Sequence, residues 1–379
     1  MAFHKKLLML FSDTGGGHRS SACAVAHALH NRYGDRISVR LLDPLDHYAP
    51  WPFNRIDTLY PYMVRLGGVP WAVGYHISDR QSWVRAVTDA CWPRVRRPVL
   101  SLVQDHPADA IVSCHPILNQ VVARGLQQIR IRTRLIALVT DLATAHAFWF
   151  TPYVQLYLVP TEEVRRRAVA SGIPPERVLV TGLPVGPQFV AAAQEDRLAV
   201  RQRLGLDPDR PVVLVVGGGE GMGPLHTLCH ALANSGVQSS IVVITGRNER
   251  LRARLAGEDW PVPVQVEGFV QNMHEWMRAA DILVSKAGPS TICEALVMGL
   301  PIILSGALPG QEVPNVDYVV RGGAGIWAPT PRDVVKAVRE LLSPARDKLE
   351  QMAARARALA CPDAAQRIAE ILWEVTRER

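Results

Sequence analysis

The stretch that decides the fold is VVLVVGGGEGMGP, residues 212–224. The five apolar residues Val212–Val216 predict a strand buried on both faces, and the glycines after it allow a sharp turn into a helix that begins near Leu225. Consecutive glycines let backbone N–H groups approach a diphosphate at a helix N-terminus, where the helix dipole favours negative charge. The segment therefore predicts a Rossmann-like unit with a phosphate loop, with a tight packing turn as the alternative.

The same order of features occurs near the start of the chain. An apolar strand at Leu7–Phe11 leads into SDTGGGH, residues 12–18, and then into a helical run from Arg19 to Tyr33. Neither glycine loop has the GK[ST] ending of a P-loop or the GxGxxG spacing, which disfavours ATPase and nicotinamide-binding functions. Together with further apolar strands, the two loops predict an α/β fold with a Rossmann-like unit in each half. Those further strands are Ala110–Ser113, Leu135–Thr140, Ile241–Thr245, Ile282–Val284 and Pro301–Leu304.

Length and composition are those of a two-domain globular enzyme. The 379 residues are 48% hydrophobic and 20% charged, and the Gly- and Pro-rich stretch Thr181–Pro187 is the expected connection between domains 1–185 and 186–379. We expect no transmembrane helix and no signal peptide. The six dispersed cysteines form no CxxC pair, which indicates reduced thiols in the cytosol and gives no zinc framework.

The basic charge is concentrated in the first half. Residues 1–190 contain 21 Lys and Arg against 13 Asp and Glu, whereas residues 191–379 contain 21 against 22. A one-sided basic excess indicates an anionic partner such as acidic lipid headgroups or nucleic acid, and solubility alone is the simpler interpretation.

Residues 51–98 are rich in both aromatic and arginine side chains. Indole rings favour the polar boundary of a bilayer, and guanidinium groups bind lipid phosphates, so this segment predicts membrane contact. Helix packing with solvated arginines, or stacking on single-stranded nucleic acid, are the alternatives. The residues predicted to contact the membrane are Trp51, Trp71, Trp83, Arg65 and Arg80.

A third motif lies between Gly268 and Glu312. A loop after the strand Ile282–Val284 brings Ser290 and Thr291 to a helix start, and Glu294 follows one turn later on the same face. This pattern places hydroxyls and amides near a phosphate and a carboxylate near a ribose diol, as a nucleotide-sugar site requires. Gln311 and Glu312 add a carboxamide and a carboxylate suited to the hydroxyls of a hexose.

Together these segments resemble a GT-B glycosyltransferase of the family that contains plant-type monogalactosyldiacylglycerol synthases and processive diacylglycerol glucosyltransferases. The lipid II N-acetylglucosaminyltransferase is a more distant member. The loop Gly217–Pro224 most resembles the galactolipid branch, and the similarity spans nearly the whole chain. It is carried by Ser12–Arg19, Ser113–Pro116, Val139–Asp141, His146, Trp149–Phe150, Thr181–Val185, Gly217–Pro224 and Gly268–Glu312.

The resemblance implies two Rossmann-like domains with parallel sheets that face an interdomain cleft. Residues 1–185 would bind the acceptor and membrane, residues 186–379 would bind a UDP-hexose, and the last helix would cross back to the first domain. The implied reaction transfers a hexose, galactose in preference to glucose, to 1,2-diacylglycerol with inversion. The donor-binding residues implied are Gly218, Gly219, Glu220, Gly221, Met222, Arg247, Phe269, Val270, Lys286, Pro289, Ser290, Thr291, Glu294, Gln311 and Glu312.

His18 is the predicted general base. It stands at the tip of the first glycine loop with Gly16 and Gly17, and an imidazole near its unperturbed pKa accepts a hydroxyl proton at neutral pH. Capping the helix or neighbouring a phosphate is its alternative role. Asp141 is predicted to orient the base or the acceptor, and His146 is a further candidate in the acceptor loop, with helix capping as the alternative for both.

No metal or other cofactor is expected. The DxD letters at Asp207–Asp209 are interpreted as a β-turn. His226 and His230 stand at i and i+4, but the sequence nearby offers no third ligand, so they are interpreted as helix packing. The amides of the Gly217–Gly223 loop and of the helix near Ser290 would instead stabilise the leaving diphosphate.

The expected partners are a UDP-hexose, diacylglycerol and anionic membrane lipids, and no nucleic acid. The expected location is the cytoplasm, peripherally bound to the inner face of the cell membrane. Three alternatives remain from the sequence: a transferase that uses UDP-glucose or a glycolipid or polyprenyl acceptor, a UDP-sugar epimerase of the same fold, and a basic protein that only binds nucleic acid or anionic lipid.

Overall fold

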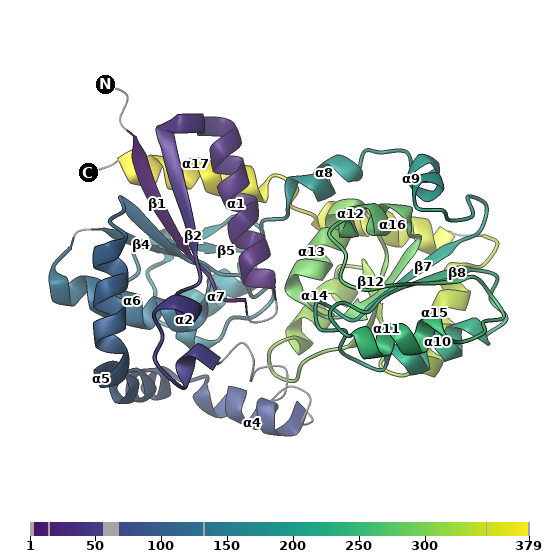
Figure 1. Ribbon diagram of the computed structural model, residues 1–379, viewed down its shortest axis with the longest axis horizontal. Helices are drawn as coiled ribbons and strands as arrows, with labels where there is room; N and C mark the ends of the chain where they lie inside the picture. The colour runs from purple at the N-terminus through teal and green to yellow at the C-terminus, as the bar shows by residue number, and fades with distance from the viewer. Residues whose placement is uncertain (1–3, 14–15, 56–67, 132, 346, 378–379) are drawn as a thin grey trace. The chain divides into compact units, whose positions relative to one another are not determined.

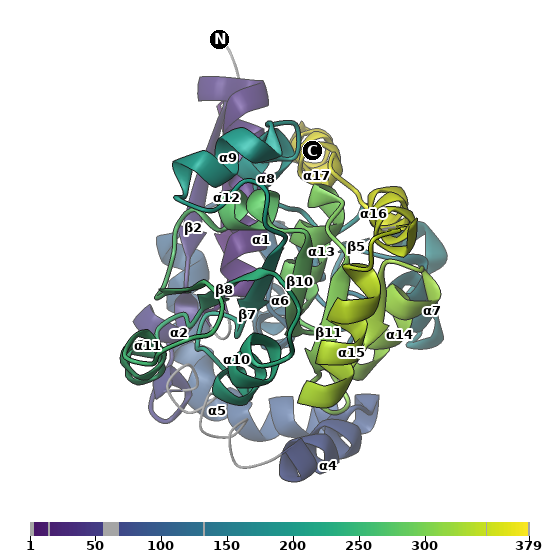
Figure 2. The ribbon, with the colours of Figure 1, turned by 90° about the vertical axis from the view of Figure 1, so that its right-hand side faces the viewer.

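The computed structural model describes residues 4–13, 16–55, 68–131, 133–345 and 347–377, with side chains for all of these except 68–71. The chain divides into two compact units (Figures 1 and 2). One comprises Met1–Pro187, Pro309–Gln311 and Cys361–Arg379, and the other comprises Gln188–Leu308 and Glu312–Ala360. Each is a parallel sheet covered by helices, which confirms the predicted α/β class.

The first unit contains a six-stranded parallel sheet in the order β2-β1-β3-β4-β5-β6. Its first strand pairs with β2 on one side and β3 on the other, with Leu7 opposite both Val39 and Ala110. The strands are β1 (Lys5–Leu10), β2 (Ile37–Leu42), β3 (Ala110–Ser113), β4 (Arg134–Leu138), β5 (Leu156–Val159) and β6 (Val178–Val180). Among the described residues, the helices of four residues or more are α1 (Gly17–Tyr33), α2 (Pro44–His47), α4 (Gly68–Ser78), α5 (Gln81–Asp105), α6 (Pro116–Ile129), α7 (Glu162–Ala170) and α17 (Ala364–Arg377).

Alternate residues of each strand point into two separate cores. On β1, Leu8 and Leu10 join the core formed with α5, α6 and α7, whereas Leu7 and Met9 join the core formed with α1 and α17. Because both faces are buried, the strand is apolar from Leu7 to Leu10, as expected for a parallel sheet between helical layers.

Helix α17 closes the second of these cores. Its residues Ile368 and Leu372 are fully buried with the apolar face of α1, and the ring of Trp373 stacks on Tyr33 at a centroid distance of 4.4 Å. A surface ion pair between Arg32 and Glu370 (2.9 Å) lies alongside. The apolar contact supplies most of the stabilisation, since exposed ion pairs contribute little.

The second unit repeats the architecture with the order β12-β11-β10-β7-β8-β9. One face of its sheet forms a core with α10, α11 and α15. The strands are β7 (Val212–Val216), β8 (Ser240–Ile244), β9 (Val264–Glu267), β10 (Ile282–Lys286), β11 (Ile302–Gly306) and β12 (Gly325–Trp327). The helices are α8 (Pro187–Ala192), α9 (Arg197–Arg203), α10 (Leu225–Ala233), α11 (Glu249–Ala256), α12 (Met273–Ala279), α13 (Pro289–Met298), α14 (Val313–Arg321), α15 (Pro331–Leu341) and α16 (Asp347–Leu359).

The packing of α17 predicts the effect of trimming one buried side chain. Leu372→Ala should lower the free energy of unfolding of the first unit by about 2–5 kcal/mol, because it removes buried methyl groups and leaves a cavity. Urea unfolding followed by tryptophan fluorescence measures the change. Glu374→Ala, an exposed position on the same helix, is the control and should change stability by less than about 0.5 kcal/mol. Equal effects of the two substitutions would contradict this packing.

Candidate functional site

In the second unit, the first strand along the chain lies inside the sheet. Strand β7 pairs with β8 on one side and with β10 on the other. The connections that leave the carboxyl ends of β7 and β10 therefore run in opposite directions. This is the topological switch point of a doubly wound sheet, where ligands bind in the crevice outside the strand ends. The glycine loop follows β7 at this point, and Lys286 is the last residue of β10.

The loop Gly217–Gly223 makes a tight turn at the end of β7. Gly221 N donates a hydrogen bond to Gly218 O (3.1 Å) and closes the turn. Gly221 has a φ of +59°, and a Cβ there would lie 2.1 Å from the carbonyl oxygen of Thr245. A residue with a side chain would therefore displace the neighbouring β8 loop, which explains the need for glycine.

Lys286 carries a positive charge between two glycine turns. A Cβ on Gly218 would lie 3.6 Å from the lysine Cε, and a Cβ on Gly288 would lie 3.2 Å from its Nζ. The ammonium group forms an ion pair with Glu312. That carboxylate is 3% exposed and also accepts a hydrogen bond from Leu308 N (3.0 Å). Glu312 thus fixes the position of Lys286, whereas the sequence pattern predicted that its carboxylate binds the hydroxyls of a hexose.

Helix α13 begins beside this lysine. Gly288 is its N-cap and offers no side chain to the first amides, and Pro289 occupies the first helical position. The half-buried side chains of Ser290 and Thr291 follow in the first turn. A helix N-terminus, a lysine and a glycine loop at one switch point are suited to bind an anionic diphosphate.

Glu294 lies one turn further along α13. Burial raises the pKa of its carboxyl to about 8. Among the residues that the structure describes, none forms a hydrogen bond or ion pair with this side chain. A desolvated carboxylate without a partner is costly unless a ligand supplies donors, and the two hydroxyls of a ribose are such donors.

A second cluster of side chains is centred on Arg247, which follows β8. Its guanidinium contacts Glu220 of the glycine loop (2.8 Å) and lies 4.6 Å from the ring centroid of Phe269. Its backbone N–H donates to Gly219 O (2.8 Å). Phe269 is 56% exposed, so the ring and the guanidinium present a flat surface that suits a planar base. Val270 is half-buried next to it.

The first unit has its own switch point, between β1 and β3. His18 follows β1, and its Nδ1 lies 2.7 Å from Thr140 Oγ1 beyond β4. The ring of His115, which follows β3, meets His18 edge-on at a centroid distance of 4.8 Å. Gly16, the N-cap of α1, has a φ of +76°, and Gly17 starts the helix. Thr140 and His115 were not assigned roles from the sequence, although both stand just beyond strand ends.

The electrostatic state of His18 differs from the expectation. Burial lowers its pKa to about 4, and a hydrogen bond with the backbone of Cys114 only partly offsets this. The expectation of an unperturbed pKa was therefore wrong, because the sequence does not reveal how far the neighbouring side chains exclude water. The imidazole is neutral throughout the physiological pH range and so is available as a proton acceptor.

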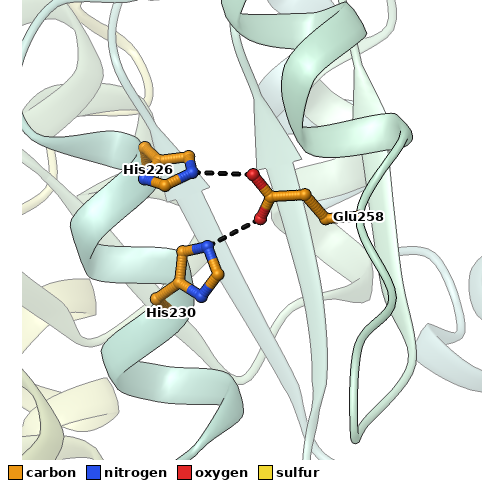
Figure 3. A group of neighbouring side chains, drawn as sticks. All are labelled: His226, His230 and Glu258. Atoms are coloured by element: carbon orange, nitrogen blue, oxygen red, sulfur yellow. Dashed lines mark hydrogen bonds and ion pairs between the residues drawn. The ribbon is translucent and has the colours of Figure 1, made fainter.

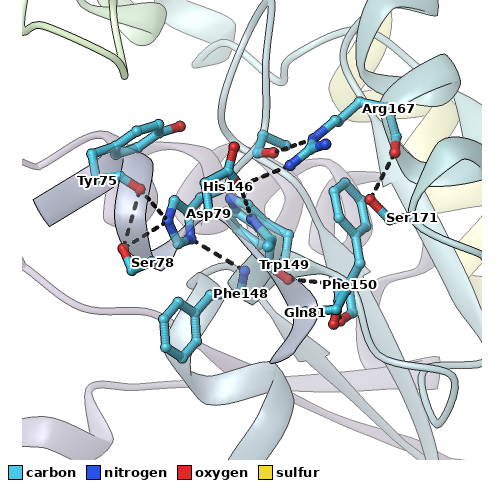
Figure 4. Close-up of polar contacts among 12 residues, drawn as sticks. Tyr75, Ser78, Asp79, Gln81, His146, Phe148, Trp149, Phe150, Arg167 and Ser171 are labelled. Carbon is cyan, nitrogen blue, oxygen red and sulfur yellow. Dashed lines mark hydrogen bonds and ion pairs between the residues drawn. The ribbon is translucent and has the colours of Figure 1, made fainter. Parts of the chain in front are cut away.

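Asp141 and His146 are both engaged in local contacts. Asp141 is buried and accepts a hydrogen bond from Trp149 Nε1 (2.7 Å). His146 Nδ1 accepts from Phe148 N (3.2 Å), and its Nε2 lies 3.2 Å from Tyr75 O, so Nε2 carries the proton and donates it (Figure 4). His146 therefore caps a 3₁₀ turn and binds the end of α4, which is the capping alternative considered from the sequence.

An apolar cavity of about 160 Å³ lies in the first unit. It is bounded by α5, α6 and the segment after β2, and it is lined almost wholly by apolar atoms. Its wall includes Phe148, a neighbour of His146. Representative lining residues are Leu45, Phe53, Val95, Leu102, Val121 and Phe148.

Two family models match the chain. One, described as monogalactosyldiacylglycerol (MGDG) synthase, matches residues 18–185, and the other, described as glycosyltransferase family 28 C-terminal domain, matches residues 212–368. The chain is 39% identical over 385 residues to a probable chloroplastic monogalactosyldiacylglycerol synthase of Glycine max, covering 99% of this chain and 72% of that relative. The chain belongs to the monogalactosyldiacylglycerol synthase family. This confirms the predicted resemblance and makes the chain a glycosyltransferase.

Solved structures share the fold of this MGDG synthase family member. The UDP-GlcNAc 2-epimerase of Neisseria meningitidis, solved with UDP-GlcNAc, has a TM-score of 0.64 at 14% identity, covering 97% of this chain and all of the epimerase. MurG of Acinetobacter baumannii has a TM-score of 0.62 at 16% identity, covering 98% and 99%. These likenesses confirm the GT-B fold.

The predicted membrane segment of this MGDG synthase homologue is only partly described. Arg65 and the side chain of Trp71 lie outside the described residues. Trp51 is 79% exposed and Trp83 is 47% exposed, and Arg80 is exposed at the N-cap of α5. None of the helices in the described parts of the chain has the length and apolar character needed to cross a bilayer.

The raised pKa of Glu294 predicts how stability depends on pH. Between pH 4.5 and about 8 the native state keeps a proton that the unfolded chain releases. Below pH 4.5 the Glu294 carboxyl is protonated in both states and does not reduce the free energy of unfolding. As the pH rises from 4.5 to 8, this free energy falls by at most about 1.4 kcal/mol per pH unit. Glu294→Gln does not titrate, so its stability relative to wild type should increase from pH 5 to pH 8.

Chemical denaturation at pH 5, 6.5 and 8 measures this difference. Glu350→Gln, at an exposed position on α16, is the control and should follow the wild-type pH dependence. If Glu294→Gln and wild type kept a constant difference across this range, the carboxyl would not be desolvated.

Proposed function

We propose that this protein transfers galactose from UDP-galactose to 1,2-diacylglycerol with inversion, giving a β-monogalactosyldiacylglycerol and UDP. The observation that carries the proposal is the combination, at the switch point of the second unit, of Lys286, the α13 N-terminus and the carboxyl group of Glu294, which has no partner among the described residues. In a member of the MGDG synthase family, this is the set of groups that a nucleoside diphosphate sugar requires.

Each part of the sugar nucleotide is assigned to the group whose charge or polarity suits it. The diphosphate is placed at the α13 N-terminus and the Gly217–Gly223 amides, with Lys286 as its cation. The ribose diol donates hydrogen bonds to Glu294, and the base lies on Phe269 beside Arg247. Support comes from the dipole, the ammonium group and the desolvated carboxylate, each of which favours the corresponding part of the donor. Gln311 is a half-buried polar residue that follows β11, and we assign it to the hexose.

The transfer is a single displacement. The acceptor hydroxyl attacks the anomeric carbon, its proton passes to His18, and the C–O bond to the diphosphate breaks, so that UDP leaves with the bonding electrons. His18 is supported as the base by its neutral state and by the hydrogen bond that Thr140 makes with its Nδ1. The charge that develops on UDP is stabilised by amides, the helix dipole and Lys286, without a divalent cation.

The first unit is proposed to bind the lipid acceptor. Its cavity of about 160 Å³ is close in volume to an engineered apolar cavity of about 150 Å³ in another protein that binds benzene. A stretch of about six acyl carbons therefore matches its size. Val73 and Ile77, one turn apart on α4, are 53% and 49% exposed, which supports a lipid-facing surface. The protein is thus proposed to act from the cytoplasmic face of the cell membrane, as a peripheral protein.

An activity assay tests this function. Purified protein with detergent-dispersed diacylglycerol should release UDP from UDP-galactose faster than from UDP-glucose, and no UDP should appear without the lipid. His18→Ala should lower kcat by about 10² to 10⁴, the usual contribution of a positioned base, while UDP affinity stays within a few fold. Activity should persist in EDTA.

Three results would each revise the proposal. Conversion of the sugar without any acceptor would indicate an epimerase, and faster turnover of UDP-glucose would change the donor. Loss of activity in EDTA with recovery on adding magnesium would show that the leaving group needs a cation. Thr140→Val is a positioning control, because it removes one hydrogen bond to His18 and should lower kcat less than His18→Ala.

Vesicle binding tests the membrane proposal. Co-sedimentation should require anionic lipid and weaken with salt, because each Arg near the surface contributes about 1 kcal/mol over a Debye length of roughly 8–10 Å. The double change Trp51→Ala and Trp83→Ala should reduce binding further. Trp327→Ala, a 42% exposed tryptophan of the second unit, is the matched control. If the protein bound zwitterionic vesicles equally at all salt concentrations, with or without the two tryptophan substitutions, the membrane-binding surface would lie elsewhere.

A further inference from the structure

Three metal-ligating side chains meet on the second unit, on the face of its sheet that carries α10 and α11. His226 and His230 stand one turn apart on α10, and Glu258 follows the end of α11 (Figure 3). Glu258 Oε1 lies 2.8 Å from His226 Nε2, and Glu258 Oε2 lies 2.6 Å from His230 Nε2. The sequence near the two histidines offers no third ligand, but the fold supplies one, because Glu258, 28 residues beyond His230, reaches both rings in the folded chain.

The surroundings hold these side chains in place without burying them. The two imidazole rings lie 4.5 Å apart between centroids, and Trp260 supports the ring of His230 at 4.7 Å. All three ligand residues are partly exposed, so an ion can reach them from solvent. Cys229, between the two histidines, is buried in the core and burial raises the pKa of its thiol to about 12, so it is not a ligand.

We propose that His226, His230 and Glu258 form a binding site for a divalent transition metal of the zinc class. Two imidazole nitrogens and one carboxylate are a donor set that zinc accepts, with water completing a tetrahedron. Bonds of about 2.0–2.1 Å place tetrahedral ligand atoms about 3.3 Å apart. The present N···O separations of 2.6 and 2.8 Å must therefore widen by about 0.5–0.7 Å, which partly exposed side chains can do.

One cation competes with the metal. Arg254 Nε lies 3.7 Å from Glu258 Oε1, and its side chain is 65% exposed. An ion pair at this distance and exposure is weak, so the guanidinium can move into solvent when the metal arrives. Removing this arginine charge should therefore leave metal binding unchanged or strengthen it.

The position of the site indicates a structural role. Helix α10 begins two residues after Gly223, and α11 begins two residues after Arg247. A metal on His226, His230 and Glu258 would join α10 to the chain after α11, and so would brace the two helices that follow the β7 and β8 loops. Catalysis itself would need no ion, so this role is independent of the proposed transfer reaction.

Zinc binding by the full chain tests the proposal. Protein freed of metal with a chelator should bind one Zn²⁺ tightly by calorimetry, and Co²⁺ should give the visible absorption of a tetrahedral site. His226→Gln with His230→Gln should abolish both signals. Glu258→Gln should weaken Zn²⁺ at least about tenfold, since even outer partners of metal ligands contribute 10- to 100-fold. Zn²⁺ should raise the Tm of wild type and not that of the double variant.

A matched control separates this site from adventitious binding. His27→Gln with His30→Gln removes two exposed histidines of α1 and should leave the Zn²⁺ affinity and the Co²⁺ spectrum unchanged. Zn²⁺ binding that is equal in wild type and in the His226/His230 double variant would overturn the proposal, as would a Co²⁺ spectrum of octahedral type. Circular dichroism of each variant establishes that it is folded, so loss of binding is attributable to the ligands.

Discussion

Burial of each parallel sheet on both faces decides where charged and polar side chains can lie in this glycosyltransferase. The strands alternate between two apolar cores, so a charged side chain within a strand would be desolvated on either face. Charged and hydroxyl groups are therefore concentrated where strands end. Because the first strand of each sheet lies inside it, two loops diverge at that point and leave room for a ligand.

The charges at the second switch point are balanced internally. Lys286 lies between two glycine turns, and its ion pair with the buried carboxylate of Glu312 holds it in place. An anionic ligand that reaches this lysine must share it with Glu312, so the gain from the ammonium group is smaller than for a free lysine. Selectivity then rests more on groups without internal partners, of which Glu294 is the clearest described case.

The sequence predicts the fold well where burial is complete. Strand β7 is apolar at every position and β3 is apolar up to its last residue, Ser113, and the predicted bounds of both match the structure. Strands β2 and β9 lie at sheet edges and contain partly exposed residues, so they lack the continuous apolar pattern. The same physical reason explains why most interior strands were recognised and edge strands were not singled out. The interior strand β5 (Leu156–Val159) was also not singled out.

The site was predictable only in part. Motifs pointed to His18 and Lys286, but the neighbour of His18 is Thr140, 122 residues away in sequence. The third member of the His226 and His230 group likewise comes from another segment. Protonation states were the hardest property to predict from the sequence, because the pKa values of His18 and Glu294 depend on desolvation by the packed structure.

Helix α17 has a consequence for how the chain is made. Residues 188–308 and 312–360 of the second unit are synthesised before the helix that completes the first. Until Ala364–Arg377 leaves the ribosome, the apolar stripe of α1, with Ala22, Val25 and Leu29, lacks its cover. Domains usually fold in the order of synthesis, but here the later unit can finish first. The earlier one would stay open to chaperones for the time needed to translate nearly two hundred further codons.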